Sequence, residues 1–332
     1  MDSSFLILGL NIPKKKLCPK LEKNVNIKPN IITFKLKLLN IFFMTCKVAY
    51  IGLGVMGYPM AGYISKADHN VTVYNRTTAK ADKWLTEFKG LKANSPSEAA
   101  KDADFVFTCV GNDNDLKEVT FGDNGIFKLI KKRSIYIDNT TASATIAREF
   151  YDYSKKNGFG FLDAPVSGGQ AGAENGALTV MIGGDQENFD KAKNIIDCYS
   201  KKMKLLGKAG NGQLAKMVNQ ICIAGLVQGL SEGINFGIKA GLNMEDVIEV
   251  ISKGAAQSWQ MENRYKTMID DKFEFGFAVD WMRKDLKIAL EEAKKNNSLL
   301  PVTEMVDQYY ADVQKLGGNR WDTSSLIRRL RK

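Results

Sequence analysis

The sequence predicts an α/β fold, a doubly wound Rossmann-type sheet followed by an all-α C-terminal domain, on three observations. Short apolar runs alternate with amphipathic helical stretches from Cys46 to about residue 207. A glycine-rich loop directly follows the first of these runs, and after residue 207 only helical periodicity remains. Alternation of strands and helices is typical of a mainly parallel sheet covered by helices. We therefore predict two domains, over residues 44–207 and 208–332.

The individual elements follow from the same patterns. Strands are expected at the apolar runs of residues 48–51, 70–74, 105–110, 134–138, 160–164 and 177–182. Helices are expected between them at residues 57–68, 78–89, 96–101, 114–119, 143–157 and 186–199. In the second domain, helices are expected at residues 210–240, 243–253, 258–269, 277–296 and 301–315. Right-handed crossovers between the parallel strands would make the first domain doubly wound.

Residues 1–43 do not continue this pattern. They mix lysines, asparagines and apolar residues without a sustained period, and they carry eight lysines but only two acidic residues. They contain no arginine and no Ala-x-Ala cleavage site, so they are a poor targeting peptide. Met44 begins the first predicted strand. We predict that residues 1–43 are a disordered tail or reflect a start codon assigned too far upstream.

Composition and charge exclude several classes of protein. Apolar residues make up 44% of the chain and charged residues 25%, as in ordinary globular proteins. The net charge of +10 is concentrated in residues 1–43, and basic residues do not interleave with aromatic ones further on, so we expect no nucleic-acid partner. No run approaches about 18 uninterrupted apolar residues, so we expect no membrane-spanning helix. The five cysteines lack CxxC spacing, which indicates reduced thiols in the cytoplasm and neither disulfides nor a metal site.

The glycine-rich loop lies between a predicted strand and a predicted helix. It consists of Gly52, Leu53, Gly54, Val55, Met56 and Gly57. In such a loop the first glycine allows a tight turn, the second lets the backbone approach a pyrophosphate, and the third allows close packing of helix against strand. The start of the following helix offers free N–H groups and a positive dipole end. The pattern therefore predicts that residues 44–207 bind a dinucleotide through this loop.

The end of the second predicted strand bears on the choice of cofactor. A site specific for NAD usually has Asp or Glu here, about 20 residues beyond the glycines, to bind the ribose 2′-hydroxyl. This chain has Asn75, Arg76 and Thr77 instead. Arg76 could pair with a 2′-phosphate, and Asn75 and Thr77 could donate hydrogen bonds to it. We therefore expect NADP as the cofactor; the alternative is a solvated Arg76 in a tolerant site that also accepts NAD.

Four segments together resemble the β-hydroxyacid dehydrogenase family, the 3-hydroxyisobutyrate dehydrogenase-like proteins, to which the 6-phosphogluconate dehydrogenases are related. Residues 50–62 resemble the family's N-terminal signature, and residues 163–169, Asp-Ala-Pro-Val-Ser-Gly-Gly, resemble its substrate-binding loop. Residues 210–220 resemble its catalytic segment, and residues 284–286, Lys-Asp-Leu, its late cofactor motif. The four occur in the family's order and spacing. The resemblance implies an NAD(P)-dependent oxidoreductase that acts on a CH–OH group and forms homodimers or homotetramers.

The resemblance also implies which residues handle the substrate. Lys216 would be the catalytic lysine, and Asn219 would orient the substrate. Ser167, Gly168 and Gly169 would hold the substrate carboxylate, because their backbone N–H groups and the serine hydroxyl can form a cradle for an anion.

A second group of residues would contact the nicotinamide end of the cofactor. Thr141 and Lys284 match family positions near the nicotinamide and its ribose, and Val110 matches the loop after the fourth strand. Gly111 departs from the Leu-Pro that family members often carry in this loop, which leaves the shape of the loop open. Trp259 could form a wall of the substrate pocket, although a buried core tryptophan fits the sequence equally well.

Lys216 is suited to proton transfer on chemical grounds alone. Hydride transfer to a carbonyl carbon leaves negative charge on the oxygen, so a proton donor must lie close to it. A lysine can serve if burial or positive neighbours lower its pKa from about 10.4 towards neutrality. Lys216 stands early in a predicted helix whose residues 217–231 carry no charge, which favours burial. The alternative is a lysine near the end of a helix that extends into water.

Glycines recur every four residues along this predicted helix, at positions 225, 229, 233, 237 and 241. Each glycine costs about 1 kcal/mol relative to alanine inside a helix. Close packing against another helix, within the chain or between subunits, would offset that cost. The alternative is that the glycines form a groove for a ligand.

We expect reversible hydride transfer between NADP or NAD and a short β-hydroxyacid or its semialdehyde. The class includes 3-hydroxyisobutyrate, serine, tartronate semialdehyde, succinate semialdehyde and glyoxylate. Two alternatives are an imine reductase-like enzyme and a non-catalytic nucleotide-binding module. Imine reducers of this shape typically lack the lysine, and an intact pair of Lys216 and Asn219 disfavours the module.

Overall fold

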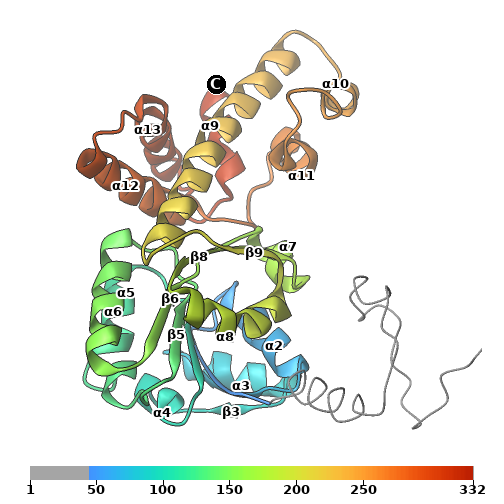
Figure 1. The fold of residues 1–332 in the computed structure, drawn as a ribbon. Helices are drawn as coiled ribbons and strands as arrows, with labels where there is room; N and C mark the ends of the chain where they lie inside the picture. The colour runs from blue at the N-terminus through green and yellow to red at the C-terminus, as the bar shows by residue number, and fades with distance from the viewer. Residues whose placement is uncertain (1–44, 332) are drawn as a thin grey trace, which may run out of the picture. The chain divides into compact units, whose positions relative to one another are not determined.

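The computed structural model describes residues 45–331, so the prediction for residues 1–43 lies outside the described part of the chain. The first half of the described residues forms a mainly parallel sheet (Figure 1). Its strands lie in the spatial order β3 (Leu91–Lys92), β2 (Asn70–Tyr74), β1 (Lys47–Ile51), β4 (Phe105–Thr108), β5 (Ile135–Asp138), β6 (Gly160–Asp163), β8 (Leu178–Gly184) and β7 (Val166–Ser167), with β9 (Ser200–Leu205) paired to β8. All pairs from β3 to β6 are parallel, whereas β8 is antiparallel to β6 and β7. The predicted doubly wound sheet is confirmed, and the strand order reverses between β1 and β4, where ligands of such sheets bind.

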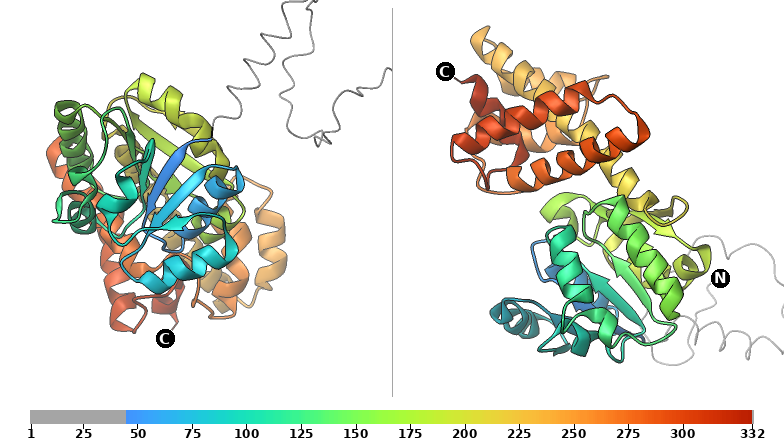
Figure 2. Two further views of the ribbon diagram at one scale, coloured as in Figure 1. Left: turned by 90° about the horizontal axis from the view of Figure 1, so that it is seen from below. Right: turned by 90° about the vertical axis from the view of Figure 1, so that its left-hand side faces the viewer.

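Helices cover both faces of this sheet, as the two views of Figure 2 show. They are α2 (Gly57–Lys66), α3 (Thr78–Glu87), α4 (Pro96–Ala100), α5 (Asp113–Phe121), α6 (Ala144–Asn157) and α8 (Gln186–Ile196). Successive side chains of a strand point to opposite faces, and in β1 Val48 and Tyr50 join the core beneath α2, α3 and α8. Ala49 and Ile51 join the other core, beneath α4, α5 and α6. Burial on both faces explains why the strand reads as a continuous apolar run.

The second half of the described residues is helical, as predicted. It contains α9 (Asn211–Lys239), α10 (Met244–Ile251), α11 (Trp259–Ile269), α12 (Val279–Asn296), α13 (Pro301–Lys315) and the 3₁₀ segment η5 (Thr323–Leu330). α9 takes part in both apolar cores of this half. Its Val227 packs in one core with Leu286 of α12 and Tyr310 of α13. Its Ile234 packs in the other with Met268 of α11, so α9 holds the helices together.

The structure also contains elements that the sequence patterns did not predict: β3, β7, β9 and α7 (Gly169–Glu174). β9 was missed because Lys201, Lys202 and Lys204 interrupt its apolar pattern and are exposed. Exposed lysines are common on edge strands, where they prevent pairing with other chains. The helix expected at residues 186–199 ends at Ile196 and is followed by a 3₁₀ turn, η4 (Asp197–Tyr199).

Packing within the described chain explains the glycine spacing of α9 at one position only. A Cβ atom on Gly237 would lie 2.1 Å from the sulfur of Met244, so a larger residue would require the side chain of Met244 to move. A Cβ atom on Gly229 or Gly233 would meet nothing within 4 Å. For these two glycines, packing between subunits stays a prediction.

Among the described residues, α9 alone is long and apolar enough to cross a membrane, with 29 residues and a mean hydropathy of 1.3 over its most apolar stretch. Length and composition are weak evidence, because core helices pass the same test. α9 is itself a core helix, because it contributes to both apolar cores of the helical half. The expectation of no membrane-spanning helix stays a prediction.

Candidate active site

The glycine loop between β1 and α2 leaves room for a pyrophosphate. Gly52 has a φ of +99°, and a Cβ atom there would lie 2.3 Å from the carbonyl oxygen of Cys109. A Cβ atom on Gly57 would lie 2.0 Å from the carbonyl oxygen of Gly52, so α2 packs closely against the loop. A Cβ atom on Gly54 would meet nothing within 4 Å. The backbone at Gly54 is therefore open to a ligand, as a dinucleotide site requires.

The start of α2 is also suited to an anion. Its first turn has no acidic residue, and no side chain caps its N-terminus. Leu53 N–H donates instead to Oδ1 of Asn75, with 2.9 Å between the atoms, which fixes the loop. Val55 and Met56 follow in the loop and lead into the helix. Because free N–H groups and the helix dipole attract negative charge, residues 52–57 fit the phosphates of a dinucleotide.

The three residues after β2 differ in how freely they could meet a cofactor. Asn75 accepts from Leu53 N–H, and its Nδ2 donates to the carbonyl oxygen of Thr77 over 3.0 Å. The side chain of Arg76 is 78% exposed, and its guanidinium lies 3.6 Å from the carboxylate of Asp115 and 3.9 Å from that of Glu118. Exposed ion pairs contribute little, so Arg76 is free to exchange them for a phosphate. The sequence patterns gave no sign of the two acidic partners.

Lys284 of α12 ties the helical half to two loops at the carboxyl end of the sheet. Its Nζ donates to the carbonyl oxygens of Gly111, over 3.0 Å, and of Thr141, over 2.5 Å. Val110 N–H donates to Oγ1 of Thr140 over 3.0 Å, which joins the loop after β4 to the loop after β5. Val110, Thr141 and Lys284 come from three separate segments and meet here.

Gly111 stands where the family pattern often has Leu-Pro, and two side chains lie close to its Cα atom. A Cβ atom on Gly111 would lie 2.4 Å from Oδ2 of Asp115 and 3.3 Å from the ring of Trp281. A larger residue at this position would fit only if the side chain of Asp115 moved aside. Its carbonyl oxygen is used to bind Lys284.

Lys216 lies in the second turn of α9 and is buried, with only 7% of its surface exposed. Burial lowers the pKa of Lys216 to about 8; the positive charge of Lys284 lowers it as well, whereas the carboxylate of Asp285 opposes the shift. The alternative of a lysine that extends into water is wrong for this position. At neutral pH the amine is mostly protonated yet able to release its proton, as an acid–base residue must be.

A chain of side-chain hydrogen bonds joins the predicted substrate loop to Lys284. The hydroxyl of Ser167 donates to Oδ1 of Asn219 over 3.3 Å. Asn219 Nδ2 donates to Gln220 Oε1 over 2.7 Å, and Gln220 Nε2 donates to Asp285 over 2.7 Å. Asp285 in turn lies 3.2 Å from Nζ of Lys284. Gln220 and Asp285 were not among the predicted site residues. Gln220 could have been found from the sequence, because it is a polar residue in an uncharged, mainly apolar stretch of the predicted helix.

Gly168 and Gly169 allow the backbone to turn sharply after β7. Their φ angles are +137° and +61°, in the region that side chains disfavour. A Cβ atom on Gly169 would meet nothing within 4 Å, so the backbone there is open. The two glycines fit the predicted anion cradle next to Ser167.

No hydrogen bond or ring interaction in the described chain joins Trp259 to the other predicted site residues. It is 48% exposed, and the guanidinium of Arg264 packs over its ring at 4.9 Å. The alternative of a buried core tryptophan is therefore wrong. A role in the wall of the substrate pocket stays a prediction.

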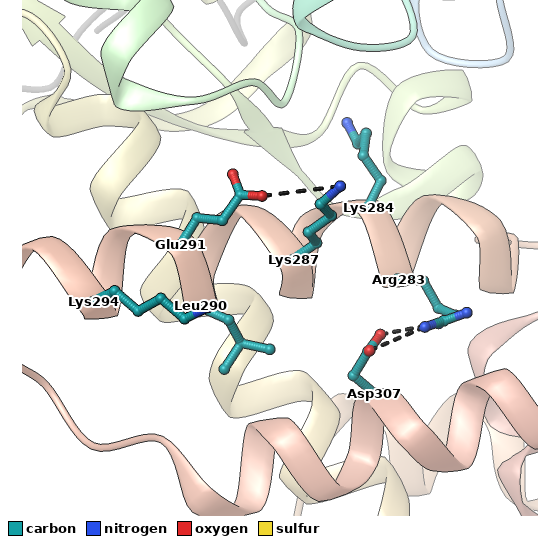
Figure 3. A pocket seen from close by; sticks show the side chains of 7 residues that line it. All are labelled: Arg283, Lys284, Lys287, Leu290, Glu291, Lys294 and Asp307. Atoms are coloured by element: carbon teal, nitrogen blue, oxygen red, sulfur yellow. Dashed lines mark hydrogen bonds and ion pairs between the residues drawn. The ribbon is translucent and has the colours of Figure 1, made fainter.

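A groove of about 410 Å³ runs along α12 beside Lys284 (Figure 3). It is lined by Arg283, Lys284, Lys287, Leu290, Glu291, Lys294 and Asp307. Arg283 forms a bidentate ion pair with Asp307, at 3.0 and 3.1 Å, and Lys287 lies 3.9 Å from Glu291. Most of its charges are thus paired, and of the predicted site residues only Lys284 borders it.

Comparison with known proteins agrees with this geometry. Residues 47–207 match the family model for the NAD binding domain of 6-phosphogluconate dehydrogenase. Residues 210–330 match that for the NAD-binding of NADP-dependent 3-hydroxyisobutyrate dehydrogenase. The chain is 62% identical to an uncharacterized oxidoreductase of Shewanella frigidimarina over 86% of this chain and 98% of that protein. It is 32% identical to 2-hydroxy-3-oxopropionate reductase of Escherichia coli over 86% of this chain and 97% of that protein.

The chain belongs to the β-hydroxyacid dehydrogenase family. It is an NAD(P)-dependent dehydrogenase that acts on a CH–OH group, as the four motifs implied. The dehydrogenase also resembles the solved structure of Mycobacterium tuberculosis 3-hydroxyisobutyrate dehydrogenase with L-serine. The two are 27% identical with a TM-score of 0.79, and the match covers 87% of this chain and 100% of the other.

Proposed function

We propose that this dehydrogenase oxidises a short β-hydroxyacid to its semialdehyde and catalyses the reverse reduction, with Lys216 as the proton-transfer residue. The observation that carries the proposal is the buried amine of Lys216, whose pKa is lowered to about 8. This amine stands on α9 one turn before Asn219 and close enough to Lys284 and Asp285 to sense their charges. A bound nicotinamide would accept or supply the hydride.

Lys216 completes the proton balance of the reaction. In oxidation, the neutral amine takes the proton of the substrate hydroxyl as the hydride leaves the same carbon. In reduction, the ammonium form returns a proton to the oxygen as the carbon gains the hydride. The amine therefore acts as a base in one direction and as an acid in the other.

The segment from Ser167 to Gly169 would hold the carboxylate of the substrate. Backbone N–H groups at the two positive-φ glycines are donors, and an anion suits such a cradle. The single O–H of Ser167 donates to Asn219 and would have to turn away from it to bind the substrate. The hydrogen bond from Ser167 to Asn219 holds this cradle against the helix that carries Lys216. The arrangement favours an acid with its hydroxyl carbon a short distance from its carboxylate.

A panel of small substrates tests the proposed class. The E. coli relative is named for 2-hydroxy-3-oxopropionate, and the M. tuberculosis structure holds L-serine. We expect turnover of at least one of 3-hydroxyisobutyrate, serine, tartronate semialdehyde, succinate semialdehyde or glyoxylate. Methyl esters of the active compounds, which lack the negative charge, should react far more slowly. Equal rates for acid and ester would contradict the carboxylate cradle.

We expect Arg76 to give a preference for NADP over NAD. Arg76→Ala should raise KM for NADPH about ten- to hundredfold, the usual range for loss of a charge-assisted hydrogen bond, and leave KM for NADH nearly unchanged. Asp115→Asn should act in the opposite direction, because it removes the nearer carboxylate that competes with the 2′-phosphate. Steady-state kinetics with both cofactors measure this; a wild-type preference for NADH would contradict it.

The lowered pKa of Lys216 sets the expected pH dependence. Oxidation needs the neutral amine, so kcat/KM for the hydroxyacid should rise with pH and level off above about 8. Reduction needs the ammonium form, so kcat/KM for the semialdehyde should fall above about the same pH. Rates in both directions from pH 6 to 10 give the two profiles. Profiles that bend in the same direction would exclude a single acid–base group.

A further inference from the structure

Gln213 clamps the first turn of α9 to the loop that follows β5. Its Oε1 accepts from the N–H of Ala142 over 3.0 Å, and its Nε2 donates to the carbonyl oxygen of Thr140 over 2.7 Å. The residue is fully buried, with 0% of its surface exposed. Both bonds join positions more than 70 residues apart, so this one side chain fixes a loop of the sheet to a helix of the other half.

The first turn of α9 has no freedom to shift under this clamp. The carboxylate of Asp163, at the end of β6, accepts from Gly210 N–H over 2.8 Å and from Gln213 N–H over 2.9 Å. A Cβ atom on Gly212 would lie 2.5 Å from the carbonyl oxygen of Met181 and 2.6 Å from that of Asp163. The start of the helix is thus held by the sheet, and Lys216, one turn further on, takes its position from this start.

The clamped loop is the one that carries Thr141. Lys284 donates to the carbonyl oxygen of Thr141, which lies between the two positions that Gln213 binds. Two side chains from two helices therefore hold three successive residues of this loop. If Thr141 contacts the nicotinamide, Gln213 fixes the distance between the cofactor end of the site and the helix that carries Lys216.

We propose that Gln213 is a positioning residue, which holds the amine of Lys216 at the distance from the nicotinamide that proton and hydride transfer require. This inference rests on the proposed function of Lys216. A displacement of about 1 Å in such a geometry can lower the rate about a hundredfold. A merely structural glutamine would change stability without changing the rate of a folded molecule.

Gln213→Glu is a test variant whose loss of activity should disappear as the pH falls. A protonated glutamic acid has the shape and hydrogen-bonding pattern of glutamine, because its carbonyl oxygen can accept from Ala142 N–H and its O–H can donate to the Thr140 carbonyl oxygen. An ionised glutamate cannot donate and would repel that oxygen. Burial raises the pKa of a carboxyl group, as do nearby carboxylates, here those of Asp163, which binds Gln213 N–H, and of Asp138, which binds Thr140 N–H. The acid form should therefore return as the pH falls towards 6. Because burial also raises the pKa of Asp138 to about 7, each rate is compared with that of wild type at the same pH.

The rate to follow is kcat for semialdehyde reduction, because the proton donor Lys216 stays charged at low pH. Expressed per folded molecule from circular dichroism, Gln213→Glu should be slower than wild type by about a hundredfold at pH 8.5 and by less than about threefold at pH 6. Cofactor affinity should change little at either pH. Gln186→Glu, the same change at an exposed glutamine of α8, should match wild type throughout.

Gln213→Met removes both hydrogen bonds at every pH and keeps a similar size. It should be slow at pH 6 and at pH 8.5, with a larger primary deuterium isotope effect than wild type when the transferred hydrogen of the cofactor is labelled. If Gln213→Met does not fold, the comparison of Gln213→Glu with itself at the two pH values decides. A ratio to wild type that stays constant with pH, or wild-type rates per folded molecule, would overturn the inference.

Lys216→Ala, run beside these variants, separates the two proposals. If it keeps normal turnover, the role proposed for Lys216 fails whatever Gln213 does. If it is inactive while both Gln213 variants keep wild-type rates and isotope effects, only the positioning role of Gln213 fails.

Discussion

Lys216→Ala should lower kcat by about 10²- to 10⁴-fold, the range expected for loss of a general acid–base residue. Nucleotide binding, followed by fluorescence, should persist, because the glycine loop lies on other elements. The substitution also removes a buried charge next to Lys284 and Asp285, so the fold should not lose stability through an unpaired group at position 216. Single-turnover rates and binding titrations on the same preparation measure both expectations.

Two further variants and a rescue experiment test whether the loss of activity in Lys216→Ala comes from the missing amine. Lys239→Ala changes an exposed lysine at the end of the same helix and should leave kcat unchanged. Lys216→Arg keeps a positive charge that cannot be released in this pH range, so oxidation should remain slow. Small primary amines added to Lys216→Ala should restore part of the rate. Near-normal turnover of Lys216→Ala would remove this residue from its role.

Gly57→Ala should lower stability, whereas Gly54→Ala should weaken nucleotide binding at unchanged stability, although each adds one carbon atom to the same loop. A Cβ atom on Gly57 would lie 2.0 Å from a backbone oxygen, which cannot move aside like a side chain. Overpacking of this kind lowers the free energy of unfolding by about 1–3 kcal/mol. Thermal unfolding of the purified variant measures the loss.

A Cβ atom on Gly54 would meet no protein atom, so Gly54→Ala should unfold with wild-type free energy, within about 0.5 kcal/mol. It would occupy the space that a pyrophosphate needs, so Kd for the nucleotide should rise about tenfold or more, equivalent to about 1.4 kcal/mol. Titration with NADPH and NADH measures this. If Gly54→Ala binds both nucleotides normally, the phosphates do not lie over this residue.

The sequence was sufficient for features that depend on local pattern. Strands buried on both faces gave uninterrupted apolar runs, and the glycine loop could be placed because it joins such a strand to a helix. The uncharged stretch of α9 correctly indicated that Lys216 is buried. β9 was missed, because an edge strand with exposed lysines has no apolar pattern to detect.

Contacts between distant segments were beyond the reach of these patterns. Gln213 is an ordinary glutamine until the fold brings it to residues 140–142, more than 70 positions away. The ion pair of Arg76 with Asp115 likewise depends on how α5 lies beside the end of β2. The environment of Trp259 was also not predictable from the sequence. Its residue type suggested a pocket wall or a core residue, and the structure leaves it half exposed.

A structure of the dehydrogenase with a bound nicotinamide nucleotide and an unreactive hydroxyacid analogue is the most direct test of the role of Lys216. We predict that Nζ of Lys216 lies within about 3.2 Å of the analogue's hydroxyl oxygen, on the same side as the nicotinamide carbon that carries the hydride. An amine directed away from both, with another group bound to that hydroxyl, would contradict the account.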